Sequence, residues 1–255
     1  MQSPKTSSQP ESFPRQSART HRFSAGAPRL YTVSPDGARV VFVRSLGGTD
    51  VVGRLWELDA ATGAERLLAD PTALHEGAEE LSHEERARRE RMREGSAGIV
   101  GYAVDDAVRH AVFALSGGLY AVDLVEPAAP VRALDVPGPV VDPRLSPDGE
   151  HVAYAAGHAL RVVRRDGTGD RALVEASHGL EQCGLADFVA AEELERSRGS
   201  WWSPQSDALL VERVDETPVQ QWWISDPLHP ASAPHPHRYH AAGTPNARVS
   251  LVLAR

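Results

Sequence analysis

The chain has 255 residues, 41% of them hydrophobic, and its 27 Lys and Arg against 35 Asp and Glu leave a formal net charge of −8 with histidines neutral. This sign argues against nucleic acid as a main partner, because phosphate binding requires a basic face. The apolar content suffices for a buried core, and the length suits one large domain or two small ones. Cys183 is the single cysteine, which excludes an internal disulfide, and we expect it to be a half-buried small residue.

No stretch of the sequence approaches the roughly 18 consecutive apolar residues of a membrane span. Residues 1–22 are polar and lack the apolar core of a secretory signal, so we expect a flexible tail there. Together these observations predict a cytoplasmic protein without a membrane partner.

Short β-like runs alternate with turn signals along the rest of the chain. Ser34-Pro35-Asp36-Gly37 and Ser146-Pro147-Asp148-Gly149 each predict a tight turn, because Pro presets φ and Gly accepts a positive φ. The expected strands fall into four units: 31–33, 38–44, 55–59 and 65–68; 102–104, 109–115 and 119–124; 141–145, 151–155, 160–164 and 171–174; and 201–202 with 208–213.

Repeats of about 40 residues with this content are typical of propeller blades, each a four-stranded sheet. The sequence therefore predicts an all-β fold, a partial β-propeller. A generic β-sandwich with chance turn matches is the alternative.

Two segments interrupt the repeats. Residues 76–94 are dense in Glu, Arg and Ala and predict an exposed, charged helix, in which Ser82 and Glu85 fit a capping box. Residues 184–199 predict a short helix with the adjacent carboxylates Glu192 and Glu193. Such a pair can hold an ammonium group through charge-assisted hydrogen bonds, but it equally fits two solvated helix residues.

Several catalytic and metal motifs are missing from the sequence. It contains no Gly-x-Ser-x-Gly nucleophile motif, and with Lys5 as the single lysine no phosphate-binding loop of the Gly-Lys type fits. A histidine cluster punctuated by prolines could ligate zinc, although an ordinary loop explains it as well. Its members are His229, His235, His237 and His240. We expect no cofactor and no metal.

Four segments of the sequence resemble the dipeptidyl peptidase IV family, within the prolyl oligopeptidase class of serine peptidases. GLADFVAAEELERSRGSWWSP, residues 184–204, is similar to the family's double-glutamate segment, and RVDETPV follows at 213–219. RYHAAGTPNARVSL, residues 238–251, resembles the family's Arg-Tyr-Pro-x-Ala-Gly-x-x-Asn stretch. EELSHEERARRERMREGSAGIVGY, residues 79–102, resembles the Arg-rich helical arm of bacterial and cytosolic members.

The resemblance implies an eight-bladed propeller followed by an α/β-hydrolase domain that carries the catalytic triad. It also implies that Glu192 and Glu193 bind the free N-terminal ammonium of a peptide, with Arg91 and Arg93 in the arm that reaches the substrate. Carboxylates at a fixed distance from the nucleophile would place the second peptide bond for attack, so that dipeptides are released. The sequence departs from the family pattern at His240 (usually Pro), at Ser200 (usually aromatic) and at Gln205-Ser206 (in place of Asp-Gly).

The expected organisation is a tail over 1–22 and about half of an eight-bladed propeller over 23–255, without the hydrolase domain. The domain would serve substrate recognition and gating in a serine-type dipeptidyl peptidase, with no catalytic residue of its own. A homodimer is an expectation for the full-length enzyme. The alternatives are a stand-alone propeller that binds other proteins without a peptidase role and, less favoured, a metal-binding protein.

Overall fold

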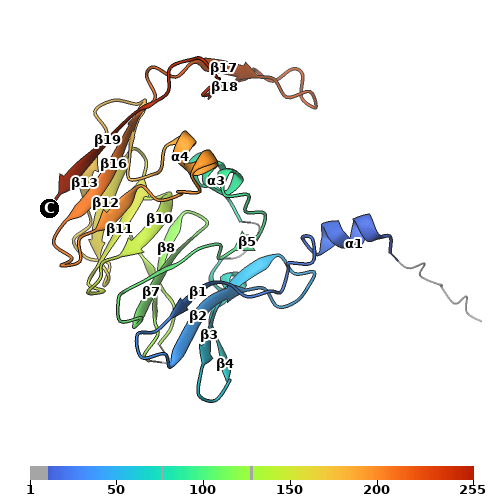
Figure 1. The fold of residues 1–255 in the computed structure, drawn as a ribbon, viewed down its shortest axis with the longest axis vertical. Coiled ribbons are helices and arrows are strands. Elements are labelled where there is room, and N and C mark those ends of the chain that lie inside the picture. Colours follow the sequence, from blue (N-terminus) through green and yellow to red (C-terminus); the bar gives the residue numbers. More distant parts are fainter. Residues whose placement is uncertain (1–10, 76, 78, 127–128) are drawn as a thin grey trace, which may run out of the picture.

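The computed structural model describes residues 11–75, 77, 79–126 and 129–255. Four antiparallel sheets follow one another along an open arc (Figure 1). Their strands, sheet by sheet, are β1 (Arg29–Val33), β2 (Arg39–Arg44), β3 (Val52–Asp59) and β4 (Glu65–Ala69); β6 (Ala103–Val104), β7 (His110–Leu115), β8 (Gly118–Asp123) and β9 (Arg132–Leu134); β10 (Val140–Leu145), β11 (His151–Ala156), β12 (Ala159–Arg164) and β13 (Arg171–Glu175); and β14 (Glu181–Cys183), β15 (Ser200–Trp202), β16 (Leu209–Asp215) and β19 (Arg248–Ala254). The prediction of a partial propeller, about half of eight blades, is confirmed.

Smaller elements join or extend these four blades. The two-residue strand β5 (Ala97–Gly98) pairs in parallel with β3, and β17 (Gln221–Ile224) with β18 (His235–Arg238) forms a hairpin that projects beyond the fourth blade (Figure 1). The helices are α1 (Phe13–Arg19), α2 (Pro71–Leu74), α3 (His83–Arg91) and α4 (Phe188–Glu193). Helix α1 lies inside the predicted tail, of which residues 1–10 fall outside the described residues.

The core lies in layers between neighbouring blades. Val41, Leu55 and Phe113 belong to the layer between the first two blades, and Val152 with Leu119 belongs to the next. The third layer joins blades three and four and includes Cys183, which is 1% exposed and therefore buried rather than half-buried as predicted. A two-layer sandwich would have a single core between two faces, so these successive layers favour the propeller over that alternative.

The predicted turns form for the expected reason. In the first blade Ser34 Oγ donates to Asp36 and the Asp36 carboxylate accepts the backbone N–H of Ala38, while Gly37 takes φ +71°. In the fourth blade, where the sequence lacks the glycine, Ser206 occupies the left-handed region at φ +62°. Its Oγ accepts the backbone N–H of Asp148 at 3.1 Å, which links the turns of blades three and four.

The charged helix is shorter and less exposed than predicted. It covers His83–Arg91, and Ser82 caps it by accepting the N–H of Glu85 at 3.1 Å. The reciprocal half of the capping box does not form, because the Glu85 carboxylate binds Arg88 and Arg89 instead. Glu85 and Arg89 are 7% and 6% exposed, so the helix predicted to be exposed buries one side of its charged surface.

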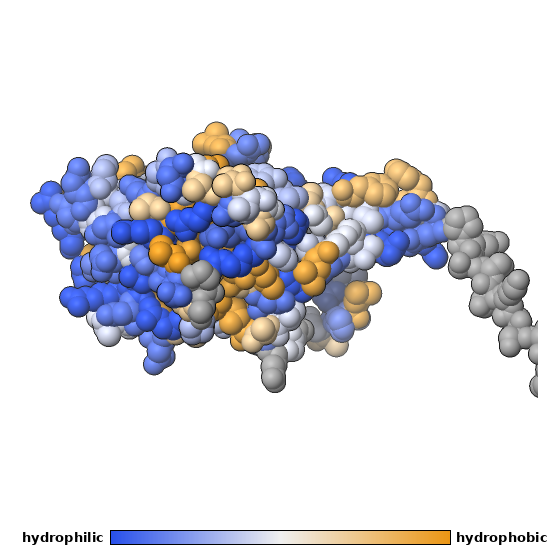
Figure 2. All heavy atoms as spheres, turned by 90° about the horizontal axis from the view of Figure 1, so that it is seen from below, coloured by the Kyte–Doolittle hydropathy of each residue, from blue (hydrophilic) through white to orange (hydrophobic). Residues whose placement is uncertain are grey.

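The surface seen from below is mostly hydrophilic, with apolar side chains in separate groups (Figure 2). Within the described residues, no helix has the length and apolar character needed to cross a bilayer.

Candidate functional site

The two glutamates lie on a loop inserted into the first strand of the fourth blade. That strand is split into β14 and β15, which both pair with β16, and residues 184–199 leave the sheet between them. We call this segment, which contains α4, the double-glutamate loop. The loop closes at its base, where Leu185 forms a bridge with Arg198. A Cβ on Gly199 would lie 2.3 Å from the backbone of Leu185, so only glycine permits this close approach.

Helix α4 begins at a strong cap. The Asp187 carboxylate accepts the backbone N–H groups of Val189 and Ala190 at 3.0 and 3.2 Å. An aspartate at this position satisfies amide donors that would otherwise lack a partner. The cap therefore defines where the helix starts and which way its last residues, Glu192 and Glu193, project.

The structure brings the arm helix α3 beside α4 on the concave side of the arc (Figure 1). Just beyond the C-terminal end of α3, Arg93 Nη2 lies 3.9 Å from Glu192 Oε2. The Arg93 side chain is 84% exposed and that of Glu192 is 26% exposed, while Glu193 is exposed. The structure thus brings two of the four predicted site residues, Arg93 and Glu192, together, with Glu193 exposed at the next position of the helix.

Arg91, the fourth predicted residue, has a different position. Its guanidinium lies over the ring of Phe188, 5.3 Å from the centroid. The imidazole of His240 stacks on the same ring at 4.8 Å with an interplanar angle of 2°. Burial holds the pKa of His240 below its ordinary value, against the opposing charge of Glu216. Arg91 therefore supports the first residue of α4 instead of projecting beside the glutamates.

A buried ion network anchors the arm helix. Arg89 donates to Glu85 at 2.8 Å and to Glu79 at 2.6 Å, and Glu79 also accepts the backbone N–H of Gly98. Burial alone would raise the pKa of Glu85, but the hydrogen bonds and charges of Arg88 and Arg89 outweigh it and hold that pKa below its ordinary value. The network ties α3 to β5, the short strand that pairs with β3 of the first blade.

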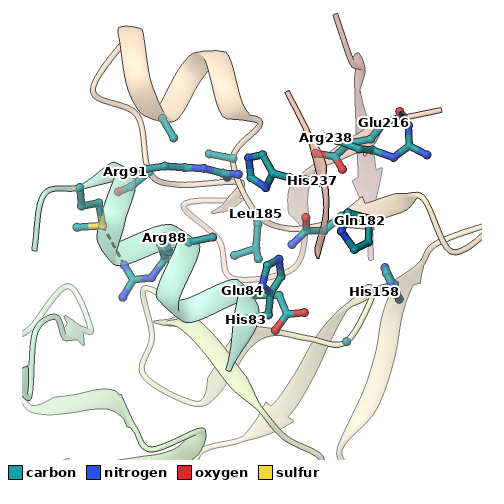
Figure 3. A pocket seen from close by; sticks show the side chains of 17 residues that line it. His83, Glu84, Arg88, Arg91, His158, Gln182, Leu185, Glu216, His237 and Arg238 are labelled. Atoms are coloured by element: carbon teal, nitrogen blue, oxygen red, sulfur yellow. Dashed lines mark hydrogen bonds between the residues drawn. The ribbon is translucent and has the colours of Figure 1, made fainter. Parts of the chain in front are cut away.

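A cavity of about 270 Å³ lies between the arm helix, the double-glutamate loop and the hairpin. In Figure 3, Arg91 extends toward His237, and Gln182 and His158 lie on the opposite side. Its lining mixes cations such as Arg88 and Arg238 with the carboxylates of Glu84 and Glu216. The cavity is a polar recess next to the glutamate pair.

The four clustered histidines do not converge. Within the ranges that the structure describes, no group of three or more His, Cys, Asp or Glu side chains is arranged to hold a metal ion. His229 instead bonds Asp226, and His240 stacks on Phe188.

Sequence reasoning missed four residues that shape this site: Phe188, Arg196, Glu212 and, in its stacking role, His240. Glu212 is 1% exposed on β16, and its carboxylate accepts the backbone N–H of Asp187 at 2.9 Å. A charged residue inside the strand pattern ALLVERV is the signal that could have found it, because buried charges require partners.

An open propeller whose fourth blade carries a double-glutamate loop beside an Arg-rich arm defines the N-terminal domain of a dipeptidyl peptidase IV-like peptidase. The family model described as "Dipeptidyl peptidase IV (DPP IV) N-terminal region" matches residues 93–255. The chain belongs to this family.

Three relatives show how far the similarity extends. Dipeptidyl peptidase 8 of Homo sapiens and that of Mus musculus are each 26% identical over 198 residues, which covers 68% of this chain and 22% of the relative. The crystal structure of Porphyromonas gingivalis dipeptidyl peptidase 4 matches with a TM-score of 0.65 and 20% identity, covering 96% of this chain and 33% of that one. The chain thus spans less than a quarter of the length of the two curated relatives, and the structural match establishes the fold.

Proposed function

We propose that this domain recognises the N-terminus of peptide substrates for a serine-type dipeptidyl peptidase and gates their access. Glu192 and Glu193 bind the free ammonium group, and the domain itself supplies no catalytic residue. In the longer enzyme, the fixed distance from this pair to the nucleophile would select release of dipeptides.

The observation that carries the proposal is that the exposed guanidinium of Arg93 lies 3.9 Å from the carboxylate of Glu192, the residue next to Glu193. An ion pair at 3.9 Å with a largely exposed arginine contributes little to folding, so its carboxylate is available to a ligand at small cost in stability. An incoming ammonium would bind the carboxylates through charge-assisted hydrogen bonds. The exposed guanidinium of Arg93 is then free to donate to a carbonyl oxygen of the same peptide.

Arg91 has a supporting part in this proposal. Since its guanidinium packs on Phe188, it stabilises the N-terminal end of α4 and lines the neighbouring cavity. Arg93 is therefore the arginine we assign to direct contact with the substrate.

The test compares binding of trialanine and N-acetyl-trialanine to the 255-residue chain by NMR titration. We expect the free peptide to shift the amide signals of residues 188–193 and the blocked peptide to leave them unchanged. Equal shifts with both peptides, or shifts that persist in the Glu192→Gln/Glu193→Gln variant, would contradict the proposal.

For the longer enzyme we also propose a homodimer. The hairpin β17–β18 offers a surface for it, because Trp222, Trp223 and Ile224 are 48%, 63% and 56% exposed. Large exposed aromatic residues of this kind are enriched at protein interfaces. Sedimentation of the Trp223→Ser variant of the longer enzyme tests the assignment, and a dimer of unchanged stability would refute it.

A further inference from the structure

A buried carboxylate lies directly beneath the double-glutamate loop. Glu212 Oε1 accepts the backbone N–H of Asp187, and Glu212 Oε2 accepts Arg196 Nη1. Arg196 Nη2 donates to Asp187 Oδ2 at 3.1 Å. The three residues form a closed triangle, which we call the Glu212 cluster.

The cluster joins both ends of α4 to the sheet. Asp187 is the N-cap of the helix, and Arg196 follows its C-terminal end, where it also donates to the backbone carbonyl of Arg198 at 2.7 Å. Glu212 belongs to β16, the strand that pairs with both β14 and β15. A helix of six residues has almost no stability alone, so its orientation depends on these anchors.

Burying Glu212 is costly unless its charge is paired and hydrogen-bonded. The hydrogen bond and charge of Glu212 raise the pKa of Arg196, in keeping with a firmly held pair. Replacement of such a pair by apolar residues of similar volume is often neutral for stability. What an apolar pair cannot do is hold the Asp187 amide and carboxylate in one position.

We propose that Glu212 and Arg196 are positioning residues of the ammonium site: they touch no substrate, and they fix the direction in which Glu192 and Glu193 project. This inference rests on the proposed function for its binding consequence. Its structural part, the fixed orientation of α4, stands independently of that function.

The decisive variant removes both charges at once, as Arg196→Met with Glu212→Leu. Since replacement of a buried ion pair by apolar residues is often neutral, we expect its Tm to stay within about 3 °C of the wild type. Its amides over 188–193 should exchange hydrogen about tenfold faster or more, because α4 loses its anchors. Its affinity for trialanine should fall at least about tenfold, because misplaced groups lose binding steeply.

A matched control uses the same chemistry in the same blade. Arg213 on β16 pairs with Glu181 on β14 at 2.9 Å, outside the loop. The Arg213→Met/Glu181→Leu variant should retain both the exchange rates at 188–193 and the affinity for trialanine. Equal effects in the two double variants would show that any charge removal in this blade disturbs the loop, and would overturn the proposal.

The single variant Arg196→Lys provides a graded readout. It keeps a cation but cannot donate to Glu212 and Asp187 from two nitrogens at once. The hydrogen-exchange rates at 188–193 and the affinity for trialanine should therefore lie between those of the wild type and those of the double variant. If the double variant retains wild-type exchange at 188–193, the cluster does not position the loop, whatever the peptide does. If exchange rises but the wild-type chain binds trialanine and N-acetyl-trialanine equally, the positioning stands and the proposed ammonium site fails.

Discussion

Arg93 and Glu192 come from insertions in different parts of the chain, and the fold brings Arg93 Nη2 to 3.9 Å from Glu192 Oε2. The arm helix connects the first blade to the second, whereas the double-glutamate loop interrupts the fourth. Their meeting on the concave side of the arc (Figure 1) depends on the curvature of the whole propeller. This relationship is the basis for the first prediction.

Replacing Glu193 by Gln should weaken the ammonium site while preserving size and packing. Because a hydrogen bond to a charged group is worth about 1.5–3 kcal/mol, kcat/KM should fall about tenfold to a hundredfold when the loop is grafted into a full-length relative. The loss should be confined to substrates with a free N-terminus. Unchanged dipeptide release in both Glu193→Gln and Glu192→Gln would mean that the pair is a solvated helix turn.

The 255-residue chain alone should not hydrolyse dipeptide amides. Its sequence contains no Gly-x-Ser-x-Gly motif, the pattern that presents a nucleophilic serine in hydrolases of this class. The assay follows release of a chromogenic amine from a dipeptide substrate. Turnover by the purified chain that a serine-directed inhibitor abolishes would refute this expectation.

The ion network of the arm helix should be sensitive to loss of its cation. Arg89→Met leaves the carboxylates of Glu79 and Glu85 without their shared partner, which should cost about 3–5 kcal/mol of unfolding free energy. Urea denaturation measures the change. The exposed Arg86 on the same helix is the control, since Arg86→Met should alter stability by less than about 0.5 kcal/mol.

Stability should fall in acid as Asp105 becomes protonated. Burial alone would raise the pKa of Asp105, but the His110 imidazole, with Nδ1 3.5 Å from Oδ2, and the backbone N–H groups of His110 and Arg109 lower it from 3.8 to about 2. Since the folded pKa is the lower one, this carboxylate stabilises the fold fully above about pH 4 and loses that effect as the pH falls to about 2. At about 1.4 kcal/mol per pKa unit, its contribution is about 2–3 kcal/mol.

Asp105→Asn should therefore reduce the dependence of stability on pH between about 4 and 2. Urea unfolding at a series of pH values measures it, with the neighbouring exposed residue changed in Asp106→Asn as the control. An unaltered pH profile in the Asp105 variant would contradict the assignment.

The chain should associate in solution through its fourth blade. Val249, Leu251 and Leu253 alternate along β19 and are 47%, 56% and 63% exposed. An apolar strand face of this kind favours pairing with a second copy. Leu251→Glu should shift sedimentation toward the monomer, whereas Ser250→Glu, between these residues on the same strand, should have less effect. A wild-type chain that stays monomeric at high concentration would count against this surface.

The sequence by itself determined the local structure. The Ser-Pro-Asp-Gly turns, the alternating runs and the Ser82 cap are recognisable because each depends on residues a few positions apart. The resemblance around Glu192-Glu193 pointed to the family, which the match over residues 93–255 confirms.

Only the tertiary structure decided which side chains from different blades come into contact. It separated Arg93, which lies beside Glu192, from Arg91, which packs on Phe188. It also showed that Arg89 and Glu212 are buried. The sequence predicted an exposed helix around Arg89 and gave no role to Glu212 within its strand. The physical reason is that burial and pairing of a charge depend on neighbours distant in sequence, which the curvature of the propeller alone brings together.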